Sequence, residues 1–330
     1  MAESTKVGGD ESGACGRRTV TLVVPVLNEA DSIRHFLESV DAAIAKAWQF
    51  PDEAPRFEFI FVDDGSTDPT ATVVRALRKN DNRIKLISLS RNFGKEAALS
   101  AGLHAATGDA AIPMDVDLQD PPDLIRPMIE EWQAGAKVVN ARRADRSADS
   151  LSKRISSRLF YWVMNAISDQ PIADDVGDFR LLDRDALTVI NGMTEQTRFN
   201  KGLFSWIGFE TATVEYVRPD RSVGQTKWKP LKLLSLAFDG ITSSSTLPLR
   251  VWTLVGSLLA VAAISYALWI VFYTFLHGIE VPGYASLMVA VLLLGGLNLV
   301  SLGLMGEYLG RIAIQVRGRP LYVVASTEGL

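Results

Sequence analysis

The chain has 330 residues, of which 48% are hydrophobic, and its mean hydropathy of +0.13 is high for a fully soluble protein. Its formal net charge of −4 gives no electrostatic reason to expect a nucleic-acid partner. The single cysteine, Cys15, excludes an intrachain disulfide and a metal site built from several cysteines, and it is compatible with a reducing compartment.

The N-terminal two thirds of the chain alternate apolar runs with amphipathic segments. Residues 1–18 are polar and glycine-rich, without the apolar run of a secretory signal, so we expect a disordered tail ahead of a cytoplasmic domain. Strict alternation of strands and helices predicts an α/β fold with a mostly parallel, doubly wound sheet. No G-x-G-x-x-G follows the first strand, which counts against a dinucleotide dehydrogenase. The predicted strands are 19–26, 57–62, 84–89, 110–114 and 137–141, with helices near 33–44, 69–77 and 95–106.

A turn rich in small and acidic residues follows the strand at 57–62. Asp63, Asp64 and Ser66 stand at the carboxyl end of that strand, where small residues let a ligand approach the backbone. The same turn also suits a purely structural role, in which it caps the next helix, and we expect that role for Asp68. Both roles fit within one loop.

The strand at 110–114 ends abruptly in a cluster of carboxylates followed by prolines. Asp115, Asp117 and Gln119 therefore stand where a strand would deliver them to a sheet edge, and open α/β sheets bind ligands at the carboxyl ends of their strands. Two carboxylates one residue apart can both reach a hard divalent cation, so a nucleotide diphosphate held through Mg²⁺ or Mn²⁺ fits this pattern. The alternative is a strand end whose acids only cap the next helix.

Basic residues gather downstream of this cluster. Arg142 and Arg143 follow the strand at 137–141, and Arg154 and Arg158 lie in a segment whose apolar residues recur at helical spacing. That mixture suits a helix at a membrane surface, but a solvated basic face packed on the domain fits the same pattern.

Two long stretches, residues 251–276 and 281–306, contain no Asp, Glu, Lys or Arg. Each exceeds the roughly 20 residues that cross a bilayer, so we expect two spanning helices that form an antiparallel hairpin within residues 249–308. The turn between them lacks Lys and Arg, whereas both outer flanks carry them, which predicts an integral membrane protein whose large domain and termini are cytoplasmic. These flanking residues are Lys227, Lys229, Lys232 and Arg250 on one side and Arg311, Arg317 and Arg319 on the other.

The segments beside the spans complete the predicted organisation. Residues 229–248 are moderately apolar, and we expect an interfacial helix there that leads into the first span. Residues 309–330 are expected to form a cytoplasmic tail. Gly295, Gly296, Gly303 and Gly306 in the second span permit close contact between helices, including helices of two subunits, which is compatible with a homo-oligomer.

Seven motifs stand in a fixed order along the chain: VPVLNE at 24–29, VDDGSTD at 62–68, RNFGK at 91–95, MDVDLQDPP at 114–122, DVGDFR at 175–180, GQTKW at 224–228, and a tail from GEYLGR at 306–311 to RPLY at 319–322. Together with the hairpin, they resemble the family 2 glycosyltransferases of the GT-A fold, and the resemblance covers most of the chain. Within that family the chain is most similar to the polyisoprenyl-phosphate glycosyltransferases, which include dolichol-phosphate mannose synthases and bactoprenol glucosyltransferases. The resemblance implies a GT-A domain at 19–228.

The resemblance also implies roles for individual residues. Asp115 and Asp117 would bind the metal, and Asp178, with Asp175 as the neighbouring candidate, matches the place of the family's catalytic acid. Arg221 and Lys227 resemble a mobile basic loop that closes over the diphosphate and excludes water, although cations beside a span also serve orientation alone. The implied nucleotide-sugar residues are Pro25, Asn28, Glu29, Asp63, Asp64, Ser66, Asp115, Gln119, Arg221 and Lys227.

The implied reaction is an inverting, metal-dependent transfer of a hexose, with UDP-glucose as the favoured donor, to a polyisoprenyl phosphate at the cytoplasmic membrane face. A phosphate monoester is already largely dianionic at pH 7, because its second pKa is about 6. The reaction therefore needs a cationic cradle for two phosphate-bearing substrates more than a strong base. Asp178 would orient the acceptor or take the proton of a monoanionic acceptor, and the expected acceptor-phosphate residues are Arg142, Arg143, Arg154 and Arg158.

Three alternatives accompany this expectation. GDP-mannose, used as in dolichol-phosphate mannose synthases, fits the same motifs. A processive polysaccharide synthase is disfavoured, because the chain has only two expected spans and QTRF at 196–199 departs from the Q-x-x-R-W pattern of such enzymes. A catalytically silent nucleotide-sugar-binding subunit is disfavoured by the intact Asp64, Asp115, Asp117 and Arg221.

Overall fold

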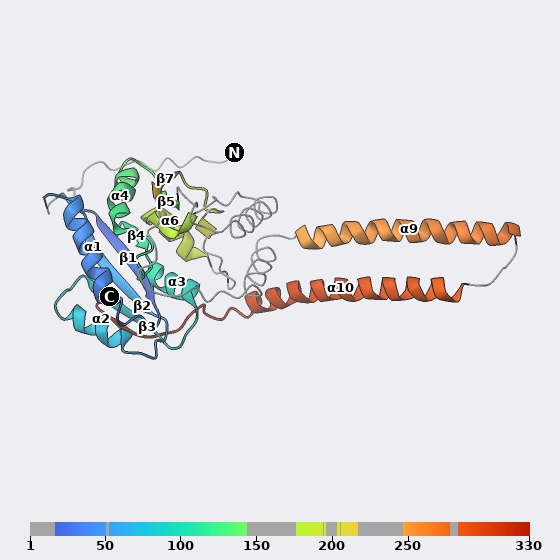
Figure 1. Ribbon diagram of the computed structural model, residues 1–330, viewed down its shortest axis with the longest axis horizontal. Coiled ribbons are helices and arrows are strands. Elements are labelled where there is room, and N and C mark those ends of the chain that lie inside the picture. Colours follow the sequence, from blue (N-terminus) through green and yellow to red (C-terminus); the bar gives the residue numbers. More distant parts are fainter. Residues whose placement is uncertain are drawn as a thin grey trace, which may run out of the picture.

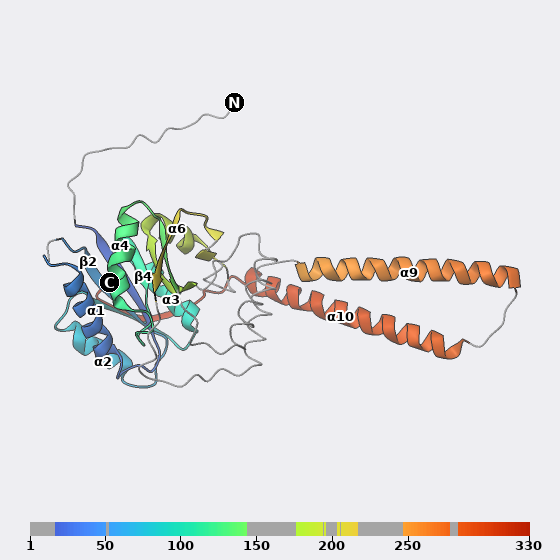
Figure 2. The same ribbon diagram turned by 45° about the horizontal axis from the view of Figure 1, so that its top comes forward.

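The computed structural model describes residues 17–50, 53–143, 176–193, 195, 203–204, 206–216, 247–277 and 283–330. In that part of the chain, an α/β domain is followed by two long helices that extend away from it side by side (Figures 1 and 2). Most of the tail expected at 1–18 and of the interfacial helix expected at 229–248 lies outside the described residues.

The centre of the domain is a sheet whose eight described strands have the order β7-β5-β6-β4-β1-β2-β3-β8. Neighbours run parallel in the pairs β1–β2, β1–β4, β2–β3 and β5–β7, and antiparallel in β4–β6, β5–β6 and β3–β8. The expected α/β fold with a mostly parallel sheet is confirmed. The strands are β1 (Thr19–Val26), β2 (Arg56–Asp63), β3 (Ile84–Leu89), β4 (Ala110–Pro113), β5 (Val138–Arg143), β6 (Val176–Asp183), β7 (Thr211–Tyr216) and β8 (Val324–Glu328).

The central strands β1 and β2 consist of nearly continuous runs of apolar residues, and their burial explains this pattern. Helices cover both faces of the sheet, so successive residues of β1 and β2 are buried instead of alternating between core and solvent. The strands pair in register from Thr19 opposite Arg56 to Val26 opposite Asp63. This register brings the carboxyl ends of both strands to the same edge of the sheet.

The helices divide between the two faces of the sheet. α1 (Ile33–Ala47), α2 (Thr70–Arg78) and α4 (Ile125–Gln133) pack on one face, where Phe36, Val74 and Trp132 join the core. α3 (Lys95–Ala105) and α6 (Arg184–Gly192) pack on the other face through Leu99, Leu187 and their neighbours (Figure 1). A short 3₁₀ turn, η1 (Pro122–Leu124), precedes α4.

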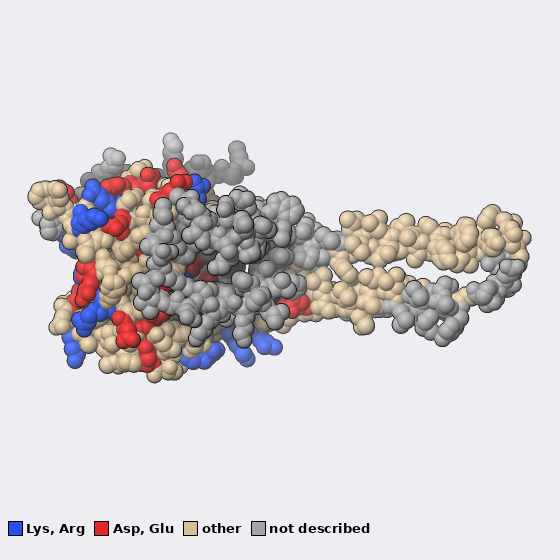
Figure 3. All heavy atoms as spheres, in the orientation of Figure 1, with Lys and Arg blue, Asp and Glu red and all other residues tan. Residues whose placement is uncertain are grey.

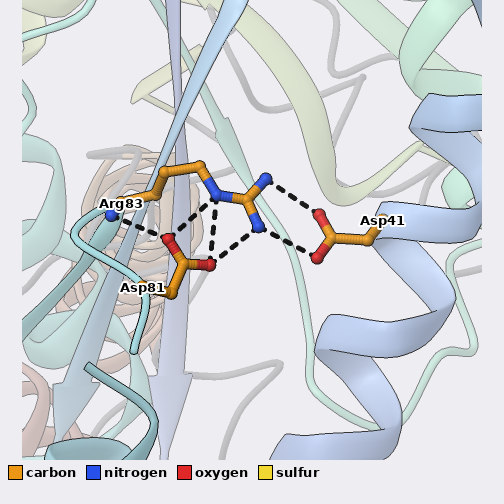
Figure 4. A network of polar contacts seen from close by, with 3 residues as sticks. All are labelled: Asp41, Asp81 and Arg83. Atoms are coloured by element: carbon orange, nitrogen blue, oxygen red, sulfur yellow. Dashed lines mark hydrogen bonds and ion pairs between the residues drawn. The ribbon is translucent and has the colours of Figure 1, made fainter. Parts of the chain in front are cut away.

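At the amino end of β3, Arg83 ties that strand to α1 (Figure 4). Its guanidinium donates to Asp81 at 2.7 Å and to both carboxylate oxygens of Asp41 at 2.9 Å, and it lies 5.2 Å from the centre of the Phe59 ring. The hydrogen bonds with Asp81 raise the pKa of Arg83, and those with Asp41 add to this effect against the opposing effect of burial. The cluster lies at the sheet edge opposite the carboxyl ends of the parallel strands, so its role is structural.

The two long helices, α9 (Leu247–His277) and α10 (Tyr284–Val316), run antiparallel and form a hairpin (Figures 1 and 2). The segments Trp252–His277 and Leu293–Val316 are long and apolar enough to cross a membrane. Figure 3 shows that charged side chains gather on the α/β domain and are scarce on the drawn surface of the hairpin. The second helix begins at Tyr284 and continues well past Gly306, the expected end of the second span.

After α10 the chain returns to the α/β domain. The sequence predicted only a cytoplasmic tail for these last residues. β8 pairs antiparallel with β3 and becomes an edge strand of the sheet. Ser90 donates its backbone N–H to Val323 at 2.9 Å, and the Tyr322 hydroxyl contacts His104 Nδ1 at 3.1 Å. The segment that follows the hairpin therefore belongs to the α/β domain.

Candidate active site

The candidate site lies at the edge where the carboxyl ends of β1, β2 and β4 meet. β6 runs antiparallel to β4, so β6 begins where β4 ends, and Asp178 comes to lie beside the carboxylates that follow β4. α3 begins at the same edge, because it follows the loop after β3. Five segments of the chain, which follow or form β1, β2, α3, β4 and β6, therefore deliver side chains to one place.

Two adjoining recesses open at this edge. The larger is a cleft of about 230 Å³, lined by Pro25, Val26, Leu27, Glu29, Asp64, Lys95, Ala98, Asp115, Val116 and Asp117. The smaller is lined by Pro25, Lys95, Leu99, Pro113, Met114, Asp115, Asp120, Asp178 and Phe179. Pro25, Lys95 and Asp115 line both recesses and form the boundary between them.

Lys95, the first residue of α3, makes ion pairs on both sides of this boundary. Its Nζ lies 2.7 Å from Asp115 Oδ2 and 3.1 Å from Asp178 Oδ2. Burial works to lower the pKa of Lys95, but the negative charges of Asp115 and Asp178 prevail and hold this pKa above its usual value. The side chain is therefore an ammonium at neutral pH.

The carboxylates after β4 fit a divalent cation. Asp115 and Asp117 both line the cleft, and the Gln119 backbone N–H donates to Asp117 Oδ1 at 3.1 Å across Leu118, which has a φ of +54°. No group of three or more His, Cys, Asp or Glu suited to a metal occurs among the described residues. Mg²⁺ is commonly held by one or two carboxylates plus substrate phosphates, and two carboxylates facing an open cleft match that arrangement.

Asp64 joins the loops that follow β2 and β3. Its side chain is 3% exposed, and its two oxygens accept from the backbone N–H groups of Phe93 at 2.7 Å and Gly94 at 2.9 Å. These bonds hold the residues just before Lys95 against the β2 turn. Asp64 also lines the cleft, so the residue that joins the two loops is also placed where the predicted binding role would need it.

Several of the other residues expected to hold a nucleotide sugar tie loops together. Asn28, with a φ of +56°, accepts from the Thr67 N–H at 2.8 Å and donates its own N–H to Ser66 Oγ at 2.9 Å. Asp63 accepts from the Ser66 N–H at 2.9 Å. These contacts fix the turn after β2 against the end of β1. Pro25 and Glu29 line the cleft, whereas Gln119 is buried and is not among the residues that line it.

Asp68 lies directly before Pro69, the N-cap residue of α2, and its side chain bonds to the first residue of that helix. Its Oδ1 accepts from the backbone N–H of Thr70 at 3.0 Å, at the start of α2.

The start of β6 carries a buried arginine near Asp178, which the sequence did not single out. Arg180 is 3% exposed, donates to the Gly177 carbonyl at 2.7 Å, and lies 4.2 Å from the centre of the Phe204 ring. Burial lowers the pKa of Arg180 to about 10, and the negative charge of Asp178 opposes this change, so the guanidinium stays charged at pH 7. Arg180 thus places a buried positive charge behind Asp178.

Residues 21–190 match the glycosyl transferase family 2 model, and residues 247–312 match the model described as the GtrB C-terminal hairpin. This chain belongs to glycosyl transferase family 2. It is 45% identical over 306 residues to a prophage bactoprenol glucosyl transferase homolog of Escherichia coli, which covers 92% of this chain and 98% of that protein. It is also 45% identical over 310 residues to a prophage-derived bactoprenol glucosyl transferase of Shigella flexneri, with coverage of 94% and 98%.

Solved structures resemble the glycosyltransferase more distantly. A mannosyltransferase of Pyrobaculum calidifontis in complex with GDP-Man and Mn²⁺ is 20% identical, with a TM-score of 0.43, and covers 92% of this chain and 88% of that chain. A glucosyl-3-phosphoglycerate synthase of Mycobacterium tuberculosis in complex with UDP is 21% identical, with a TM-score of 0.41, and covers 68% of this chain and 78% of that chain.

The expected acceptor-phosphate residues of the glycosyltransferase are only partly described. Arg142 lies near the same sheet edge, because it is close to the carboxyl end of β5 and β5 runs in the same direction as β4. It forms an exposed ion pair with Glu215 on β7. The backbone of Arg143 ends β5. Arg154 and Arg158, the other two expected acceptor-phosphate residues, lie outside the described part of the chain. The catalytic candidate Asp175 and the expected nucleotide-sugar residues Arg221 and Lys227 lie outside it as well.

Lys95 is the other residue at the site that the sequence did not single out. The RNFGK motif contains it, and that motif was a signal for the site. Nothing in the motif, however, indicates which of its residues points at Asp115 and Asp178, because those partners come from two other segments.

Proposed function

We propose that the glycosyltransferase transfers glucose from UDP-glucose to a polyisoprenyl phosphate, such as undecaprenyl phosphate, at the cytoplasmic face of a membrane. The product would be a β-linked polyisoprenyl-phosphate glucose. The observation that carries this proposal is the cleft in which Glu29, Asp64, Asp115 and Asp117 converge, in a chain 45% identical to bactoprenol glucosyl transferases over nearly its whole length. The apolar hairpin next to the domain supports a lipid-borne acceptor.

Asp115 and Asp117 would hold Mg²⁺ or Mn²⁺ against the diphosphate of the donor. When bound there, the cation supplies charge compensation for the diphosphate as it leaves. Pro25, Glu29 and Asp64 line the part of the cleft that would receive the nucleoside. The donor would therefore lie along the larger recess, with its sugar directed toward the boundary at Lys95.

The acceptor phosphate would enter from the side of Asp178. An acceptor oxygen forms a bond to the anomeric carbon, the bond from that carbon to the β-phosphate oxygen breaks, and UDP leaves from the opposite side, which inverts the anomeric configuration. The attacking phosphate is already largely dianionic at pH 7, so the residues mainly position it and balance charge. We assign Asp178 this positioning role, with Asp175, Arg142, Arg143, Arg154 and Arg158 as further candidates on the acceptor side.

The sheet supports the proposed membrane topology. Because β8 pairs with β3, the segment after the hairpin and the glycosyltransferase domain lie on one side of any membrane that α9 and α10 cross. The cationic flanks of the hairpin favour the cytoplasmic side. Arg221 and Lys227, which precede α9 in the chain, would then lie near the membrane surface and could close over the donor.

Transfer of radiolabelled sugar into an organic-extractable lipid tests the proposed function. Purified protein is mixed with polyisoprenyl phosphate, Mg²⁺ or Mn²⁺, and each member of a panel of UDP- and GDP-sugars. We expect label in the lipid from UDP-glucose, its loss with EDTA, and a decrease of roughly a hundredfold or more in Asp117→Ala. Asp123→Ala is the matched control, because Asp123 is an exposed carboxylate that pairs with Lys46 away from the cleft.

Each other outcome selects a different function. Label from GDP-mannose instead of UDP-glucose would indicate a mannosyl transferase. Binding of nucleotide sugars without any labelled lipid would indicate a catalytically silent subunit, and Asp115 and Asp117 would then be binding residues only.

A further inference from the structure

The charged side chains that line the two recesses of the site are almost all negative. Among the described residues that line them, Lys95 is the one cationic side chain, and six carboxylates surround it. These are Glu29, Asp64, Asp115, Asp117, Asp120 and Asp178. Two phosphate-bearing substrates that enter such a site are repelled by it and by each other, so a cation at the boundary between the recesses has a large effect.

Lys95 already bridges the two sides of that boundary. Asp115 belongs to both recesses, whereas Asp178 lines only the smaller one, on the side away from Glu29, Asp64 and Asp117. An ammonium has three N–H donors, and these two carboxylates use two of them. Lys95 also follows Phe93 and Gly94, whose backbones Asp64 holds in place, so the position of its Cα is fixed.

We propose that Lys95 occupies the position beside Asp115 that a divalent cation would take, and that it binds the acceptor phosphate once the divalent cation is present. Without metal, the ammonium neutralises Asp115 and Asp178 together. When a divalent cation binds Asp115, Lys95 stays on Asp178 and directs its released N–H donors into the smaller recess, toward the acceptor phosphate. This inference rests on the proposed function for the identity of the acceptor, but the competition between Lys95 and the metal does not depend on it.

The competition between Lys95 and the metal predicts the direction in which metal affinity changes when Lys95 is replaced. Lys95 lies 2.7 Å from an oxygen that a metal would use, so its removal should strengthen metal binding, whereas removal of an ordinary metal-site residue weakens it. A unit charge at this distance in a partly exposed site changes affinity by about tenfold. The direction of the change therefore distinguishes a placeholder cation from a residue that merely supports the fold.

The first experiment measures binding of Mn²⁺ alone to the purified full-length protein, from the electron paramagnetic resonance signal of free Mn²⁺. We expect Lys95→Met to bind Mn²⁺ about tenfold more tightly than the unsubstituted protein, and Lys95→Arg to bind it about as tightly. Lys46→Met is the matched control, because Lys46 is an exposed lysine paired with Asp123. Unchanged or weaker Mn²⁺ binding by Lys95→Met, with an unchanged thermal unfolding midpoint, would overturn the placeholder role.

Asp178→Asn tests the same competition between Lys95 and the metal by changing the second ion-pair partner of Lys95. It also provides a test if Lys95→Met does not fold. With Asp178 neutralised, Lys95 rests wholly on Asp115, so Mn²⁺ should bind several-fold more weakly. Mn²⁺ binding as tight as in the unsubstituted protein would contradict the shared ion pair.

The second experiment addresses the acceptor. At saturating Mn²⁺, Lys95→Met should raise the KM for polyisoprenyl phosphate at least tenfold while the KM for the nucleotide sugar changes by less than about threefold. Equal changes in both constants would overturn the acceptor-side role. Failure of the unsubstituted protein to transfer any sugar would instead overturn the proposed function, and the Mn²⁺ comparison would remain decisive for Lys95.

Discussion

Gly65 lies where the turn after β2 contacts the loop after β3, beside the cleft. Its φ is +73°, and a Cβ at this position would come within 2.6 Å of the backbone nitrogen of Asn92. The turn after β2 and the loop after β3 can therefore touch only because this residue has no side chain. The bonds from Asp64 to Phe93 and Gly94 depend on the same approach.

Gly65→Ala should separate these loops. A side chain at positive φ and a clash with backbone together cost on the order of 2–5 kcal/mol, and Lys95 would move away from Asp115 and Asp178. Thermal unfolding and the sugar-transfer assay should both show a loss. Gly192→Ala is the matched control, since a Cβ there meets nothing within 4 Å at the end of α6, and its stability should be unchanged or higher by up to about 1 kcal/mol.

The roles of Asn28 and Ser66 show where residue-level prediction from the sequence was incomplete. Both were expected to hold the nucleotide sugar, and both form hydrogen bonds between the loops after β1 and β2. The sequence alone does not show whether a polar side chain in a turn bonds to a ligand or to another loop. Contacts with a nucleotide therefore stay a prediction for these two residues.

At the scale of elements, a buried polar network links β1, β2 and β3. Glu58 on β2 accepts from Thr21 on β1, pairs with Lys85 of β3 at 2.7 Å, and accepts from the Thr107 N–H at 3.2 Å. Burial works to raise the pKa of Glu58, but the hydrogen bonds from Lys85 and Thr21 prevail and lower it below the usual 4.5. The network crosses the sheet far from the cleft and stabilises its centre.

This network predicts an acid-dependent part of the stability. A carboxyl group with a lowered pKa in the folded state contributes fully above its ordinary value of 4.5, and the contribution is lost as the pH falls through the lower, folded-state value. Glu58→Gln should lower stability at pH 7 by about 1–3 kcal/mol and flatten the pH dependence below pH 4.5. The measurement is the thermal midpoint from pH 7 to pH 3, and equal slopes for both proteins would contradict the assignment.

β8 provides a second prediction at this scale. Deletion of residues 324–330 would remove the ladder to β3 and the ion pair between Arg75 and Glu328, which measures 2.6 Å. The edge of β3 would then be exposed beside the loop that leads to Lys95. We expect a lower thermal midpoint, more aggregation in detergent and weaker sugar transfer. Deletion of residues 329–330 alone leaves the strand intact, and it should have little effect.

The elements that the sequence predicted well are those whose pattern is local. The strands from β1 to β5 are largely buried runs bounded by turns, and the stretches 251–276 and 281–306 contain no charged residue, so each can be predicted without knowledge of its neighbours. β8 (VASTE) is short, exposed and polar, and its partner strand lies more than 230 positions earlier. Lys95 was missed for the same reason, because its meaning depends on Asp115 and Asp178 in other segments.

For the whole molecule, the proposed topology predicts which residues face each side of the membrane. We would replace Cys15 with serine and introduce a single cysteine, either Ile279→Cys between the two helices or Ser326→Cys on β8. A membrane-impermeant maleimide applied to intact cells should label residue 279 and should label residue 326 only after permeabilisation. The opposite pattern would place the domain outside, and labelling of both residues in intact cells would contradict a spanning hairpin.

The return of the chain to β3 has a consequence for the order in which the protein is completed. β8 follows α10 in the sequence, so the edge of β3 stays open during synthesis until both apolar helices have been made. Final closure of the sheet thus comes after the hairpin has had its opportunity to enter the bilayer. Until β8 has been made, the sheet has an unpaired edge next to the loop that leads to Lys95, and such an edge can pair with other chains.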